Sequence, residues 1–336
     1  MSACALKLWR YRGLQTVTLE NEHLRVDLFP GAGAKIYNLF YKPKNLQLLW
    51  HHPQLEPGAV TLGASYDDNF SGGWDELFPN DAPTEFQGRN LPDHGELWCQ
   101  PWDIEVIRED AEEVTILLRR AGTASAALME KWITLRDGES MLRFRHRITN
   151  LGTTRLDFLW KLHPAMQVSE FHRVDVPGRR AEFVGPAWSR LDGALAEFDW
   201  PIARNARGEH ADLRFVLPAS SRKKDFIYVK ELDDGWCAVT DAKHKVGFGL
   251  VFPREIFRWV WLFMPAGGWR GLNMVILEPC TAYPKDLHVA SKAGHCARLE
   301  PGSVLECATL GVVFSGCTGV AGIDGDGTVT PIGEDE

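Results

Sequence analysis

Residues 127–150 read ALMEKWITLRDGESMLRFRHRITN. Apolar and polar residues alternate on both sides of Asp137-Gly138, and an Asp-Gly pair between alternating segments is a strong signal for a tight β-hairpin turn. The stretch therefore predicts two antiparallel strands, over residues 127–135 and 140–148, joined by residues 136–139.

Alternation with a period of two also dominates the rest of the chain, whereas long helical periodicity is almost absent. Many strands with hairpin connections and few helices predict an all-β fold, an antiparallel sandwich or barrel. Residues 178–224, rich in Gly, Pro, Arg and Ala, predict long loops instead. Further strands are predicted over residues 23–30, 34–41, 112–120, 155–168, 225–232, 235–242, 245–252, 257–264, 273–279 and 304–314.

The chain has 336 residues, and 45% of them are hydrophobic, which is enough for a large core. This length permits two domains, but all-β folds often run this long as one. We expect a single domain over residues 1–316 and a flexible, Gly-rich acidic tail over residues 317–336. In that tail, Asp324-Gly-Asp326-Gly resembles part of a calcium loop but lacks the full set of ligands.

Charge and cysteine content exclude several functions. The formal net charge of −8 argues against nucleic-acid binding through a broad basic surface. No stretch is long and apolar enough to cross a membrane, and residues 1–13 lack the apolar core of a signal peptide, so we expect a cytoplasmic protein. The seven cysteines have scattered spacings without a C-x-x-C pair, which predicts reduced thiols rather than a zinc or redox site.

A carboxylate ends one of the most apolar strands. In NMVILEPCTAYP (273–284), Glu278 shares a strand face with Met274 and Ile276, so it continues an apolar row. Glu278 either reaches water at the strand end or is partly desolvated. In the second case its pKa is raised, and it suits the role of a general base near neutral pH.

A second strand carries two basic residues on one face. In DFLWKLHPAMQV (157–168), alternation places Lys161 and His163 on the same side, and Pro164 is expected to end the strand just after them. That side either faces a functional cleft or is exposed to plain solvent.

Two loops rich in aromatic residues add candidates. LPDHGELWCQPW (91–102) places His94 before Gly95, on a tight turn from which a side chain can be aimed into a cleft. FSGGWDELFPN (70–80) has a Gly-Gly turn before Trp74. Taken alone, each loop is explained equally well by aromatic packing on the core.

The order of these four stretches is more specific than any one of them. Together with FRWVWLFMP (257–265), they resemble the aldose 1-epimerase (galactose mutarotase-like) superfamily, especially its hexose-6-phosphate epimerase-like branch. The resemblance covers roughly residues 20–315 and implies a β-supersandwich of antiparallel sheets with an open sugar cleft. The motifs that carry it read SGGWDELFP, LPDHGELW, ITNLG…LHPAM and VILEPCTAYP in this chain.

The resemblance also implies residue roles. His163 takes the position of the general acid, Glu278 that of the general base, and His94 that of a second histidine near the anomeric centre. In mutarotation, a proton leaves the anomeric hydroxyl, another reaches the ring oxygen, and the ring opens. Rotation about C1–C2 and closure give the other anomer. No metal or organic cofactor is needed, and the expected partner is a small-molecule sugar bound by a monomer or homodimer.

Further residues are candidates for contacts with the sugar. The aromatic faces of Trp74, Trp98 and Trp261 suit packing against the C–H side of a sugar ring. Asp93 adjoins the His94 turn. Lys161 is a candidate contact for a phosphate, sulfonate or carboxylate, or else an ordinary solvated lysine.

The sequence departs from the phosphate-sugar branch at two places. That branch has an Arg shortly after its His-Gly pair, where this chain has Leu97-Trp98, and the early Arg of the family is Lys35 here. A phosphorylated substrate is therefore not implied, and the sequence leaves the sugar open among neutral, sulfonated and phosphorylated hexoses.

Three alternatives remain at the level of sequence. The first is a non-catalytic sugar-binding or regulatory protein on the same fold. The second is a glycosidase or lyase, which requires two cleft carboxylates, and Asp75, Glu76 and Asp93 are available. The third is a metal site, which adjacent histidines suit poorly because of their geometry. Its candidate ligands would be His51, His52, His94 and His163.

Overall fold

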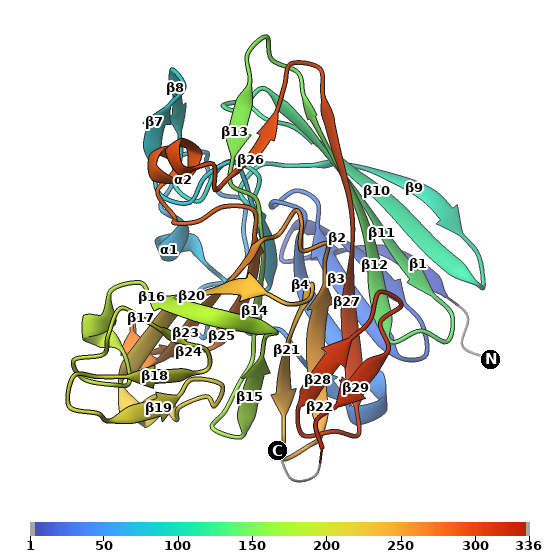
Figure 1. Cartoon of the computed structure of the whole chain (residues 1–336). Coiled ribbons are helices and arrows are strands. Elements are labelled where there is room, and N and C mark those ends of the chain that lie inside the picture. Colours follow the sequence, from blue (N-terminus) through green and yellow to red (C-terminus); the bar gives the residue numbers. More distant parts are fainter. Residues whose placement is uncertain (1–3, 334–336) are drawn as a thin grey trace. The chain divides into compact units, whose positions relative to one another are not determined.

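The computed structural model describes residues 4–333 and is shown in Figure 1. The chain divides into two compact units. Unit 1 comprises Met1–His163 and Thr281–Leu310, and unit 2 comprises Pro164–Cys280 and Gly311–Glu336. The single domain expected over residues 1–316 stays a prediction. Two of the three boundaries between the units fall within strands, β14 (Lys161–Met166) and β27 (Val304–Ser315), and the third falls between Cys280 and Thr281.

Unit 1 contains two runs of hydrogen-bonded antiparallel strands. The first run has the order β1-β2-β3-β4-β6, with β5 beside β4, and the second has the order β12-β11-β10-β9. The strands of these runs are β1 (Ala5–Tyr11), β2 (Leu14–Glu20), β3 (Leu24–Phe29), β4 (Lys35–Tyr41), β5 (Leu46–Gln47), β6 (Trp74–Leu77), β9 (Asp103–Glu109), β10 (Glu113–Ala121), β11 (Ala127–Arg136) and β12 (Met141–Asn150).

Short elements complete unit 1. Two small antiparallel pairs, β7 with β8 and β13 with β26, lie outside the two runs. None of the helices within residues 4–333 is long and apolar enough to cross a membrane. The remaining elements are η1 (Lys42–Lys44), α1 (Tyr66–Asn69), β7 (Thr84–Phe86), β8 (Arg89–Leu91), β13 (Leu156–Phe158), α2 (Leu287–Ala293) and β26 (Ala297–Leu299).

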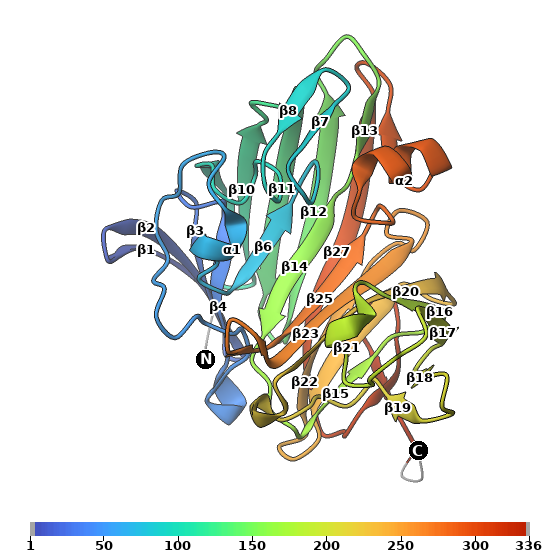
Figure 2. The same ribbon diagram turned by 90° about the vertical axis from the view of Figure 1, so that its left-hand side faces the viewer.

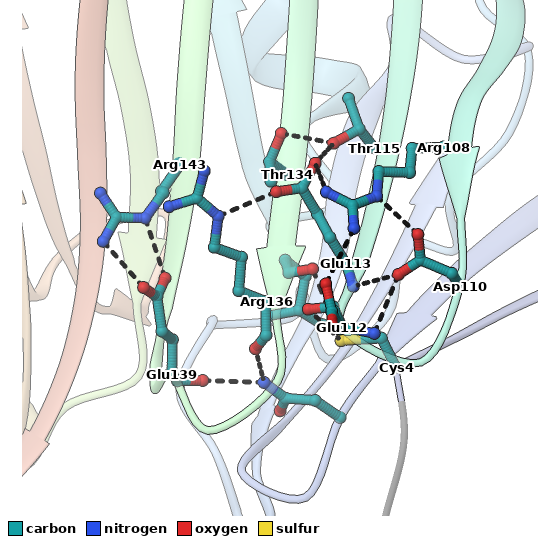
Figure 3. A network of polar contacts seen from close by, with 12 residues as sticks. Cys4, Arg108, Asp110, Glu112, Glu113, Thr115, Thr134, Arg136, Glu139 and Arg143 are labelled. Carbon is teal, nitrogen blue, oxygen red and sulfur yellow. Dashed lines mark hydrogen bonds and ion pairs between the residues drawn. The ribbon is translucent and has the colours of Figure 1, made fainter.

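The hairpin predicted from residues 127–150 is confirmed. β11 and β12 pair from Ala127 opposite Asn150 to Thr134 opposite Arg143. Gly138 in the turn has φ +73°, a left-handed conformation that glycine adopts without steric strain. Figure 3 shows the polar network at this end of β9–β12, where Arg136 on β11 donates to Glu113 on β10 and Arg143 on β12 donates to Glu139 in the turn.

The two runs of unit 1 pack on each other through β6. Trp74 on β6 packs against Phe144 on β12, with ring centroids 5.0 Å apart. The carboxylate of Glu76 accepts hydrogen bonds from the Lys131 ammonium (2.9 Å) and the indole N–H of Trp160 (3.2 Å). The sequence suggested only a loop over residues 70–80, because β6 is short and its pairing with β4 is formed by residues far away in the chain.

The predicted strand over residues 155–168 is two strands, β13 and β14. The break falls at Leu159 and Trp160, whose backbone N–H groups donate to the Pro79 carbonyl (2.8 Å) and the Thr281 hydroxyl (2.9 Å). Pro164 lies inside β14 rather than after it, because the fixed φ of proline is compatible with an extended backbone.

Unit 2 also consists of antiparallel strands. One run has the order β25-β23-β20-β16-β17, with β24 beside β23, and another has the order β15-β21-β22. Residues 178–224, predicted to be loops, contain four short strands and two single turns of 3₁₀ helix. The elements are β15 (His172–Asp175), β16 (Gly178–Phe183), η2 (Pro186–Trp188), β17 (Glu197–Asp199), β18 (Ile202–Arg204), β19 (His210–Asp212), η3 (Ala219–Ser221), β20 (Lys223–Leu232), β21 (Trp236–Asp241), β22 (Val246–Val251), β23 (Trp259–Trp269), β24 (Leu272–Asn273) and β25 (Val275–Cys280).

The predicted flexible tail carries a hairpin. β28 (Val320–Ile323) pairs with β29 (Val329–Pro331), and Val320 and Ile323 are buried. The backbone N–H of Val320 donates to the Asp175 carboxylate at 3.0 Å, which ties β28 to the rest of unit 2. Two apolar side chains are therefore buried in a segment whose composition predicted flexibility. Residues 334–336 of the predicted tail lie outside the described residues.

Candidate active site

His163 is a buried, neutral imidazole. All residues of β14 are buried, and alternation along the strand places Lys161 and His163 on the same side. Burial lowers the pKa of His163 well below its usual range, and the positive charge of Lys161 lowers it further, with smaller contributions from His94 and Lys35. The ring is therefore uncharged at neutral pH.

A tyrosine on α1 links His163 to a buried ion pair. The Tyr66 hydroxyl lies 3.2 Å from His163 Nδ1 and 2.8 Å from Asp75 Oδ2. Lys35 Nζ donates to the same Asp75 oxygen at 2.7 Å and to the Gly72 carbonyl at 2.8 Å. Figure 2 shows α1 next to β6, the strand that carries Asp75. Residues from α1, β4, β6 and β14 thus meet in one buried cluster.

His94 projects from a strained turn beside the same tyrosine. His94 and Gly95 have φ values of +55° and +73°. A Cβ at position 95 would lie 2.0 Å from the Phe78 carbonyl oxygen, so only glycine fits there. The His94 ring stacks on the Tyr66 ring with centroids 4.3 Å apart, and its Nδ1 lies 2.8 Å from Asp93 Oδ1. The positive φ values confirm the tight turn predicted from the His-Gly pair, and the contacts with Tyr66 and Asp93 hold the His94 ring.

Asp93 connects the turn to α1. Its Oδ2 accepts the backbone N–H of Tyr66 at 2.7 Å, and its other oxygen contacts His94. Burial opposes ionisation of Asp93, but the hydrogen bonds from His94 and the Tyr66 backbone outweigh it and hold its pKa below the usual range. Asp93 is therefore an ionised acceptor that positions His94 and Tyr66.

Lys161 forms a buried ion pair. Its Nζ lies 2.6 Å from Asp81 Oδ1, and His94 Nε2 lies 3.9 Å from the same oxygen. Although burial disfavours the Asp81 carboxylate, the charges of Lys161 and His94 hold its pKa below the usual range. An anionic sugar group at Lys161 would have to compete with Asp81, which the sequence did not reveal.

In unit 2, Glu278 belongs to a row of buried side chains on one face of the sheet. Trp261 on β23 lies opposite Glu278 on β25, and Tyr228 on β20 lies opposite Trp261. The Tyr228 and Trp261 rings have centroids 4.7 Å apart. Glu278 is only 2% exposed, so the alternative prediction that its side chain reaches water at the strand end is wrong. The strand face shared by Met274, Ile276 and Glu278 is as predicted.

The three candidate tryptophans are all buried. The Trp98 indole N–H donates to the Asp93 carbonyl at 3.1 Å, and its ring meets Tyr66 edge to face with centroids 4.9 Å apart. Trp74 packs on β12, and Trp261 is fully buried in unit 2. Their proposed contacts with a sugar stay predictions.

The remaining histidines of the metal hypothesis have other contacts. The His51 ring stacks on Tyr37, with centroids 3.9 Å apart. His52 Nδ1 accepts the backbone N–H groups of residues 54 and 55. Within residues 4–333, no group of three or more His, Cys, Asp or Glu side chains is arranged to hold a metal ion. The seven cysteines, all within this range, are free thiols.

Sequence reasoning missed Tyr66 and Asp81, and it assigned no role of this kind to Asp75. Tyr66 lies in a segment without a motif, and its importance depends on contacts with residues 9, 28 and 97 positions away. Asp75 was noted only as a possible glycosidase carboxylate. No local sequence pattern identifies Tyr66, Asp75 or Asp81 as a site residue, because each of them acquires its role through a contact with a residue that is distant in the sequence.

Comparison with known proteins supports the fold. No protein-family model matches the chain. The structure is similar to a galactose mutarotase-like protein from Clostridium acetobutylicum (TM-score 0.65, 11% identity, covering 93% of this chain and 99% of that one). It is also similar to a galactose mutarotase related enzyme from Lactobacillus acidophilus (0.60, 15%, 89% and 97%). A third similar structure is a Klebsiella pneumoniae protein provisionally named an aldose 1-epimerase (0.69, 14%, 90% and 79%).

These similarities define the class of fold. The chain has the all-β, antiparallel fold of the galactose mutarotase-like proteins, as the order of its motifs predicted. At identities of 11–15%, the similarity concerns the fold, and function depends on the residues of the site.

Proposed function

We propose that this protein is an aldose 1-epimerase (mutarotase), an isomerase that interconverts the α and β anomers of a hexose or an acidic hexose derivative. His163 and Glu278 are the proposed proton-transferring residues. The observation that carries the proposal is the state of His163, a desolvated imidazole held by Tyr66, whose own hydroxyl contacts an ion pair. The free cysteines fit the reducing environment of the cytoplasm, where we expect the protein to act as a monomer or homodimer.

The chemistry of mutarotation suits such groups. One group takes a proton from the anomeric hydroxyl while another supplies a proton to the ring oxygen, and the roles reverse on closure. An imidazole and a carboxylate can each exchange a proton in this way, and each contributes on the order of 10²–10⁴-fold. His94, fixed by Asp93, is the proposed contact near the anomeric centre.

The substrate is the less defined part of the proposal. Lys161 is the proposed contact for an anionic group, although its ion pair with Asp81 favours a neutral hexose over a 6-phospho sugar. Trp74, Trp98 and Trp261 remain the proposed aromatic contacts.

A direct test follows α/β anomer exchange by NMR on a panel of neutral hexoses, uronates, 6-phospho sugars and 6-sulfonate sugars. The wild type should accelerate exchange of at least one sugar, and His163→Gln or Glu278→Gln should lose on the order of 10²–10⁴-fold. His51→Gln is the matched control, since His51 is a partly buried histidine of unit 1 whose ring stacks on Tyr37. Binding of a sugar without exchange would favour a non-catalytic sugar-binding protein, and full activity of His163→Gln would refute the assignment of that residue.

The glycosidase alternative is not favoured. A general acid of that reaction needs a carboxyl with a raised pKa. Burial raises the pKa of Glu76, but the charges of His146 and Lys131 outweigh burial and hold it well below the usual range. The pKa of Asp93 is lowered as well. Glu76 and Asp93, two of the three carboxylates named for this alternative, stay ionised at neutral pH and are poor proton donors.

A further inference from the structure

The Tyr66 hydroxyl carries one proton and lies within hydrogen-bonding distance of both Asp75 and His163. It lies 2.8 Å from Asp75 Oδ2 and 3.2 Å from His163 Nδ1. A tyrosine hydroxyl can donate one hydrogen bond while it accepts others. The acceptor to which the hydroxyl donates this proton therefore determines whether His163 Nδ1 is protonated.

The ion pair with Lys35 places the proton. Lys35 Nζ lies 2.7 Å from Asp75 Oδ2, the same oxygen that the tyrosine contacts, so Asp75 is an ionised carboxylate and can only accept. The Tyr66 hydroxyl must then donate to Asp75, in the shorter and charge-assisted hydrogen bond. Its oxygen is left as an acceptor toward His163, and two facing lone pairs are avoided only if Nδ1 carries a hydrogen.

We propose that Tyr66 and Asp75 are positioning residues that hold His163 with its proton on Nδ1, in the order His163 Nδ1–H to Tyr66 O–H to Asp75. In the neutral ring, Nε2 then carries the lone pair. The neutral ring therefore first accepts a proton from the sugar at Nε2 and later returns it from the same atom, so the proton that reaches the ring oxygen during opening comes from the other proton-transferring group. The catalytic meaning of this assignment rests on the proposed function, whereas the assignment of the tautomer does not.

The arrangement also explains how the ring can become charged during a reaction. Lys161, His94 and Lys35 place positive charge around His163 and oppose formation of an imidazolium. Asp75 is the negative group on the other side of Tyr66, and its charge reaches the ring through the tyrosine hydroxyl. A carboxylate that orients an imidazole and stabilises its charged form is the principle of the Ser-His-Asp triad, here with a tyrosine between the two groups.

The rings around His163 make Tyr66→Phe a conservative test. The Tyr66 ring meets His163 edge to face and stacks on both His94 and Phe70. Phenylalanine retains these ring contacts and removes only the hydroxyl. Tyr37→Phe is the matched control, because Tyr37 is also a buried tyrosine of unit 1 but lies among Phe29, Tyr11 and His51.

The experiment is ¹⁵N NMR of the full-length protein labelled at histidine, with the His163 signals assigned by their loss in His163→Gln. At a pH where the ring is neutral, the wild type and Tyr37→Phe should show a protonated Nδ1 and an unprotonated Nε2. Tyr66→Phe should shift His163 toward the Nε2–H tautomer and lower the rate of anomer exchange by up to about 10²-fold. A wild-type ring protonated on Nε2 alone would overturn the proposal, and so would a tautomer unchanged in Tyr66→Phe.

Failure of this proposal and failure of the proposed function give different results. The Nδ1–H tautomer in a protein that exchanges no anomers would refute the mutarotase function and leave the assignment of Tyr66 and Asp75 in place. Rapid exchange by a protein with the Nε2–H tautomer would refute the assignment and leave the function in place.

Discussion

Two regions of unit 1 contain ion pairs of the same length in opposite surroundings. The inner pairs, Lys35–Asp75 at 2.7 Å and Lys131–Glu76 at 2.9 Å, join side chains that are at most 7% exposed. The strand-end network of Figure 3 includes Arg108–Asp110 at 2.6 Å, with both side chains more than 40% exposed. Distance does not distinguish these regions, but access to water does.

Burial changes what an ion pair does. Water screens the strand-end network, so its pairs contribute little to stability and their loss is tolerated. In the inner pairs each charge has lost its hydration, so removal of one partner leaves the other charge buried and uncompensated. The same burial allows Asp75 to act on His163 through Tyr66, because a buried charge is weakly screened.

The largest expected effect is loss of Glu76. Glu76→Ala removes the acceptor of Lys131, His146 and the Trp160 indole, and should lower the free energy of unfolding by about 3–5 kcal/mol. Urea denaturation followed by tryptophan fluorescence measures this. Glu112→Ala is the control, since Glu112 is 87% exposed in the strand-end network. Similar losses in the two variants would refute the distinction between the regions.

Two glycines, one in each region, test the contrast between buried and exposed surroundings through the backbone. Gly95 and Gly138 both have φ +73°. A Cβ at position 95 would overlap the Phe78 carbonyl, whereas at position 138 the nearest atom, of Glu22, is 3.9 Å away. Gly138→Ala should cost about 1–2 kcal/mol from backbone strain alone, and Gly95→Ala clearly more.

Thermal unfolding of the two alanine variants, measured at equal protein concentration, provides the comparison. Gly95→Ala should also change the NMR chemical shifts of His94. Gly138→Ala should leave them unchanged, because its effect is confined to the turn around residue 138. Equal melting temperatures would show that the space around Gly95 does not matter.

The third prediction concerns pH. An unfolded histidine binds a proton below about pH 6.5, whereas folded His163, with its lowered pKa, does not. Stability from His163 is therefore fully present above about pH 6.5 and falls as the pH drops toward its folded pKa, by up to about 1.4 kcal/mol per pH unit. Burial is the main cause of this lowered pKa, and the charges of Lys161, His94 and Lys35 lower it further.

Urea denaturation between pH 5 and 8 tests this slope. His163→Gln should flatten it, and His210→Gln, at an exposed position of unit 2, should not. His51 and His172 also have lowered pKa values because of burial, so a smaller slope should remain. An unchanged slope in His163→Gln would contradict a neutral, buried ring.

The smallest effects are expected in the strand-end network. Arg143→Ala removes a two-point hydrogen bond to Glu139 and should cost less than about 1 kcal/mol. Arg108→Ala should leave the urea midpoint unchanged within error. At high salt, the difference in unfolding free energy between each variant and the wild type should disappear. A large loss of stability that does not depend on salt would show that water and ions do not screen these ion pairs.

Local pattern predicted much of the fold. The hairpin over residues 127–150 was predicted because alternation and the Asp-Gly turn lie within one stretch. β6 was not, because its residues pair and pack with segments near residues 36 and 144. The hairpin at the C-terminal end was not predicted because its polar composition hides two buried side chains, Val320 and Ile323.

The candidate site follows the same division. The sequence by itself determined that Lys161 and His163 share one strand face and that Glu278 continues an apolar row, because alternation of side chains is a property of the extended backbone. It also determined the turn at His94, since the following glycine permits a positive φ. Only the tertiary structure decided that Tyr66 joins His163 to Asp75, because that contact spans 97 residues and exists only once the strands have packed.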